Sequence, residues 1–86
     1  MPIYKKNAGL VEQVVDGELV VLDQESGQIH QFNATANEIW TCLDGETTID
    51  DVSKHISEHY DIDLDVARKD VESTLQLLQE QNLIKI

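Results

Sequence analysis

The sequence predicts an α+β fold in which a three-stranded antiparallel sheet precedes three helices (β-β-β-α-α-α). Two observations carry this prediction. Short β-prone runs separated by Gly-containing turns occupy the N-terminal part, and helical stripes of apolar residues occupy the rest. Strands and helices that are segregated along a chain are typical of α+β domains. The hairpin and the two helices joined by a short turn also resemble a winged helix-turn-helix.

Turn residues delimit the strands. Asp16-Gly17 tolerates positive φ and forms a hairpin turn, and a second turn covers Gln24–Gly27. Asn33 stops the last strand and can cap the helix that follows through its side-chain oxygen. The expected strands are residues 10–15, 18–23 and 28–32.

Capping residues and apolar spacing define the helices. Thr48 is the expected N-cap of the second helix, with Asp51 three residues later, and Asn82 is a plausible C-cap of the third. Trp40 lies on the apolar stripe of the first helix and is expected at the centre of the core. The expected helices run from about Ala34 to Leu43, Ile49 to Tyr60 and Asp65 to Gln81, before an apolar-rich tail at 83–86 that can add a strand.

Length and charge restrict the function. A chain of 86 residues predicts one domain, of which we expect residues 1–9 to be flexible. The net charge of −11 opposes binding to nucleic acid, which requires clustered Lys and Arg. The sequence has a single cysteine and no long apolar run, so we expect a cytoplasmic protein without a disulfide or membrane span.

The order of these motifs resembles the PqqD-like proteins, whose pattern has a Gly turn, an aromatic-rich strand, Leu-Asn-x-Thr-x-x-x-Ile-Trp and Asp-Gly. Phe32 replaces the usual Leu, Asn82 stands where Gly is frequent, and Ile29 and His30 stand where aromatic residues are common. The resemblance covers about residues 10–86. The matching segments are Asp16-Gly17, Val21–Asp23, Gly27–Phe32, Asn33-Ala34-Thr35-Ala36-Asn37-Glu38-Ile39-Trp40, Leu43–Gly45, Thr48–Val52, Asp70-Val71, Leu77-Leu78 and Asn82–Ile84.

The resemblance implies peptide recognition without catalysis. PqqD-like domains bind the leader segment of a ribosomally made precursor peptide and present it to a modifying enzyme, often a radical S-adenosylmethionine enzyme. The leader adds as an antiparallel strand to the strand at 28–32, in the groove beside the helix at 65–81. The peptide-binding residues that this implies here are Gln28, Ile29, His30, Gln31, Phe32, Val66, Lys69, Asp70, Ser73, Thr74 and Leu77.

The residues themselves are compatible with this role. The run Gln28–Phe32 contains neither Pro nor Lys, the residues that commonly protect a sheet edge. On the second face of the last helix, Val66 and Leu77 are the apolar candidates for peptide contact, whereas Lys69 and Asp70 are typical of a solvated face.

Other functions have weaker support. The same edge is suited to pairing with a second copy, which would make the domain an oligomerisation module. A winged-helix nucleic-acid binder is disfavoured by charge, and no nucleophile, base and pocket combine as in an enzyme. His55 and His59 have metal-binding spacing, but two ligands alone are more typical of solvent-facing histidines, so we expect neither a metal nor another cofactor.

Overall fold

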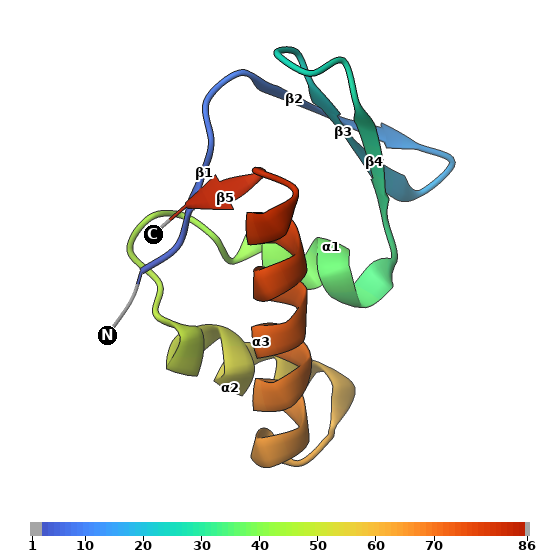
Figure 1. The fold of residues 1–86 in the computed structure, drawn as a ribbon. Coiled ribbons are helices and arrows are strands. Elements are labelled where there is room, and N and C mark those ends of the chain that lie inside the picture. Colours follow the sequence, from blue (N-terminus) through green and yellow to red (C-terminus); the bar gives the residue numbers. More distant parts are fainter. Residues whose placement is uncertain (1–2, 86) are drawn as a thin grey trace.

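The computed structural model describes residues 3–85 and confirms the α+β architecture (Figure 1). A three-stranded antiparallel sheet stands toward one end of the molecule, and the three helices with a two-stranded sheet form the rest. The elements in chain order are β1 (Lys5–Lys6), β2 (Leu10–Val15), β3 (Glu18–Asp23), β4 (Ile29–Phe32), α1 (Ala34–Thr41), α2 (Ile49–Tyr60), α3 (Leu64–Glu80) and β5 (Ile84–Lys85).

The main sheet has the strand order β2-β3-β4, so β2 and β4 are its edges. The turn between β2 and β3 places both Asp16 and Gly17 at positive φ, as its sequence predicts. Phe32 at the end of β4 lies opposite Leu19, and both are buried against the helices. The chain passes directly from β4 through Asn33 into α1, where the Asn33 side chain accepts a hydrogen bond from the Ala36 N–H at 2.8 Å.

Both ends of the described chain meet in a second, two-stranded sheet. Lys5 and Lys6 in β1 pair with β5, and Asn7 N–H donates to the Leu83 carbonyl at 2.9 Å. Met1, Pro2 and Ile86 lie outside the described residues. Within residues 1–9, Lys5 and Lys6 are paired with β5. The flexibility expected of residues 1–9 stays a prediction. The tail does form the strand for which its apolar residues are suited.

Several element boundaries differ from the sequence prediction. α1 ends at Thr41 rather than Leu43, because Cys42 and Leu43 donate to carbonyls three residues back and tighten the last turn. Gln28 belongs to the turn before β4, where its N–H donates to Ser26 Oγ at 3.2 Å. The last helix begins and ends one residue earlier than expected.

Trp40 occupies the centre of the core, with no solvent-exposed surface. Its ring meets Phe32 edge to face, with 5.3 Å between centroids, and its Nε1 donates to Glu12 Oε1 at 2.7 Å. Lys6 Nζ lies 4.7 Å from the centroid of the Trp40 ring. One side chain of α1 therefore contacts β1, β2 and β4, and fixes the sheet relative to the helices.

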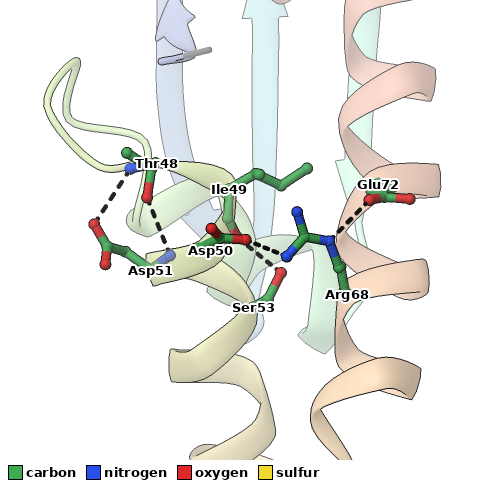
Figure 2. Close-up of polar contacts among 7 residues, drawn as sticks. All are labelled: Thr48, Ile49, Asp50, Asp51, Ser53, Arg68 and Glu72. Carbon is green, nitrogen blue, oxygen red and sulfur yellow. Dashed lines mark hydrogen bonds and ion pairs between the residues drawn. The ribbon is translucent and has the colours of Figure 1, made fainter. Parts of the chain in front are cut away.

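Polar contacts define the start of α2 and its packing against α3 (Figure 2). Thr48 and Asp51 form a reciprocal capping box. Arg68 on α3 contacts both Asp50 on α2 and Glu72 on its own helix. None of the helices in the described part of the chain has the length and apolar character needed to span a bilayer.

Candidate functional site

The outer edge of β4 presents backbone groups that pair with no other residue in the described range 3–85. In antiparallel strands, residues that exchange hydrogen bonds with the neighbouring strand alternate with residues that do not. Asp23 N–H donates to the Gln28 carbonyl at 2.9 Å, and the register then directs the N–H and C=O groups of His30 and Phe32 toward β3. The N–H and C=O groups of Ile29 and Gln31 consequently face away from the sheet.

The side chains of β4 alternate between the two faces of the sheet. Phe32 is buried and His30 half-buried, on the face that looks toward the helices. Ile29 and Gln31 are exposed on the opposite face, where 69% of Ile29 is accessible to solvent. Consequently the backbone of Ile29 and Gln31 forms the free edge, while the side chains of His30 and Phe32 lie beside it on the helix side.

A groove of about 300 Å³ separates this edge from α3. Its wall on the helix side comes from the C-terminal half of α3, where the lining positions follow helical spacing. Its residues are Ile29, His30, Gln31, Phe32, Asn33, Ala36, Thr74, Leu77, Leu78 and Gln81.

The groove includes some of the residues that the sequence predicts and omits others. It brings together Thr74 and Leu77 with four of the five predicted strand residues. Gln28 lies in the preceding turn. Four predicted residues lie on α3 outside the lining: Val66, Lys69, Asp70 and Ser73.

Four lining residues were not predicted as site residues from the sequence. Asn33 was expected only as a helix cap, and Ala36 packs against the core from α1. Leu78 is buried in the core, yet it also forms part of the groove. Gln81 follows Thr74 and Leu77 at helical spacing, so extending that face by one turn would have identified it.

One polar atom beside the groove lacks a partner. The Nε2 atom of His30 is buried without a hydrogen-bond partner among residues 3–85. A buried polar group in this condition carries a desolvation cost of about 1–3 kcal/mol. The His30 ring is therefore a polar group of the groove lining that has a buried atom unpartnered within the described chain.

A larger hollow of about 550 Å³ lies elsewhere, between the segment after β1 and the turn before β4. It is lined mainly by polar residues of turns and strand ends, and Leu10 at the start of β2 also borders it. Size alone therefore does not make it the better candidate for peptide binding, which requires main-chain groups as well as an apolar surface.

Cys42 lacks the environment of a reactive thiol. Burial raises the pKa of the Cys42 thiol, and the nearby carboxylates of Glu38 and Asp44 raise it further. Catalytic cysteines have a lowered pKa and a cationic environment, so the structure gives this side chain the character of a packing residue.

The sequence matches the protein family described as "Coenzyme PQQ synthesis protein D (PqqD)" over residues 18–84. The chain belongs to the PqqD family. The match extends from β3 to β5 and therefore contains the whole groove of this PqqD-family chain. No curated protein matches the sequence at a significant level.

Solved structures share the fold of this PqqD-family chain at low sequence identity. Lasso peptide synthetase B1 complexed with the leader peptide has a TM-score of 0.89 and 22% identity, covering 99% of this chain and 100% of that one. TbiB1 in complex with the TbiA(beta) leader peptide has a TM-score of 0.85 and 22% identity, covering 94% of each chain. The PqqD truncation of Methylobacterium extorquens PqqCD, described as a stand-alone RiPP recognition element, has a TM-score of 0.81 and 16% identity, covering 98% and 89%.

Proposed function

We propose that this chain is a non-catalytic recognition domain for the leader segment of a ribosomally made precursor peptide. The leader adds as an antiparallel strand to the outer edge of β4, and its side chains on the inner face enter the groove against α3. The domain then presents the peptide to a modifying enzyme, for which a radical S-adenosylmethionine enzyme is the leading candidate.

The observation that carries the proposal is the free β4 edge beside an apolar groove. The outward N–H and C=O groups of Ile29 and Gln31 supply main-chain hydrogen bonds, and Phe32, Leu77 and Leu78 supply apolar contact. β-Strand addition requires this combination, since backbone bonds provide affinity and side-chain pockets provide specificity. Membership of the PqqD family and the leader peptides bound by two structures of the same fold support the same reading.

Replacing Gln31 with Pro tests the edge directly. Proline removes an N–H that faces away from β3, so the β3–β4 ladder is retained while one bond to the leader is lost. The loss of that bond and the steric change at the edge should weaken leader binding by about tenfold or more, since tenfold corresponds to about 1.4 kcal/mol. Binding is measured by amide NMR titration with synthetic leader segments from short open reading frames beside the gene.

A proline on the opposite edge of the sheet provides the matched control. The Gln24 N–H donates to the Gly9 carbonyl, so every second residue of β2 from Gly9 onward bonds to β3. Val14 falls between these residues, so its N–H points away from β3, and its side chain is 67% exposed. Val14→Pro should therefore leave leader affinity unchanged. If folded Gln31→Pro binds the leader as tightly as the wild type, or if both variants weaken binding equally, the leader does not add to β4.

A further inference from the structure

A cluster of three potential metal ligands joins α1 to α2, away from the groove. His55 and His59 lie one helical turn apart on α2, and Glu38 reaches them from α1. One ligand atom from each residue lies within 4.8 Å of the other two. The two imidazole rings stack at 16° with 5.8 Å between centroids, and His55 Nε2 lies 2.8 Å from Glu38 Oε1.

We propose that Glu38, His55 and His59 form a binding site for a divalent transition metal of the zinc class. Two imidazole nitrogens and one carboxylate oxygen are a donor set that zinc accepts as three protein ligands, with a fourth position left open. Histidines four residues apart on a helix present their rings to the same ion. Glu38 could not be predicted as the third ligand from the sequence, because it lies on a different helix from His55 and His59 and no residue spacing relates it to them.

The observed geometry requires only small rearrangements to accept the ion. Ligand atoms bound to zinc at about 2.1 Å in a tetrahedron lie roughly 3.4 Å from one another. The contact between His55 and Glu38 is shorter than this spacing, and every separation in the cluster is within 4.8 Å. Because His55 and His59 are exposed and Glu38 is half-exposed, side-chain rotations can adjust these distances without moving either helix.

The charge of the cluster also suits a cation. Neutral imidazoles paired with one carboxylate give a site with a net charge of about −1, which a divalent ion compensates. Without metal the same residues make an exposed contact, of a kind that contributes little to stability.

Bound metal would connect α1 to α2 at the helix that follows β4. Asn33 caps α1 immediately after the free strand, and Ala36 on the same helix lines the groove. A metal bridge would therefore stabilise the scaffold that carries the groove. With three protein ligands, a fourth coordination position would remain for water or for a side chain from a partner protein.

Zinc chloride titration of the folded protein tests the site by calorimetry and by histidine-ring NMR. We expect one zinc per chain, with shifts of the His55 and His59 ring nitrogens, while the His30 ring nitrogens, which are not part of the cluster, do not shift. His59→Asn and Glu38→Gln should each weaken zinc binding by at least about tenfold, the loss that even outer-shell substitutions produce. Glu46→Gln removes the same charge at an exposed position outside the cluster and should have no effect.

Two results would overturn the proposal. One is the absence of saturable zinc binding to the wild-type protein. The other is equal affinity in wild type and Glu38→Gln, which would reduce the cluster to an ordinary pair of surface histidines. Circular dichroism of each variant verifies that it is folded, so a loss of binding reports on the ligands.

Discussion

His30 lines the groove and also carries a buried ring nitrogen without a partner among the described residues. The register places this ring opposite Val21, a fully buried residue. The unpartnered Nε2 atom destabilises the folded chain unless water or a bound peptide satisfies it. A Phe side chain at this position would have no such atom to satisfy.

Replacing His30 with Phe should therefore raise the free energy of unfolding by about 1 kcal/mol. The substitution removes the unpartnered nitrogen and keeps a ring on the helix side of β4. Urea denaturation measures the change. Ile29→Phe places the same side chain on the exposed face and should change stability little. A loss of stability in His30→Phe would mean that the imidazole is satisfied in the folded protein.

Among the secondary-structure elements, α2 follows most directly from local sequence. Thr48 and Asp51 have the capping spacing, and both hydrogen bonds of the capping box are present. The strands beside Asp16-Gly17 and the helix after Asn33 are equally local in origin, and their types were predicted correctly. By contrast, β1 consists of two residues that pair across almost the whole chain, so no periodicity reveals it. The apolar tail indicated that a strand could form at β5 but gave no indication of its partner.

Thr48→Ala should reduce the free energy of unfolding by about 1 kcal/mol. The substitution removes the hydroxyl that accepts the Asp51 N–H and so leaves one donor of the first turn unsatisfied (Figure 2). Urea denaturation provides the measurement, and Thr48→Ser is the control because it retains the hydroxyl. Equal losses in the Ala and Ser variants would show that the methyl group, rather than the cap, is responsible.

The relative lengths of β4 and α3 explain why the candidate site was predicted only in part. The 17 residues of α3 extend about 25 Å at 1.5 Å per residue. The four residues of β4 extend about 13 Å and can line only part of that length. Helical periodicity places Val66, Asp70 and Leu77 on one face but does not say where the strand lies along it. The structure puts the groove at the C-terminal half, which excludes Val66 and Asp70.

Across the whole molecule, net charge and the free β4 edge act in opposite directions on self-association. The edge can pair with a second copy as readily as with a peptide. Each chain carries a net charge of −11, and of its six basic residues Arg68 already contacts Asp50 and Glu72. Repulsion between two such chains extends over the Debye length, which is about 10 Å at 0.1 M salt and longer in dilute buffer.

We therefore expect the mass of a single 86-residue chain by light scattering at low ionic strength. Raising the salt concentration to about 0.5 M screens the repulsion, so any dimer should appear there and increase with protein concentration. Because such a dimer would use the β4 edge, Gln31→Pro or an excess of leader peptide should dissociate it, whereas Val14→Pro should not. A dimer that persists in dilute buffer and withstands the leader would show that the chain associates through another surface. The leader and a second copy would then bind to separate surfaces rather than compete for β4.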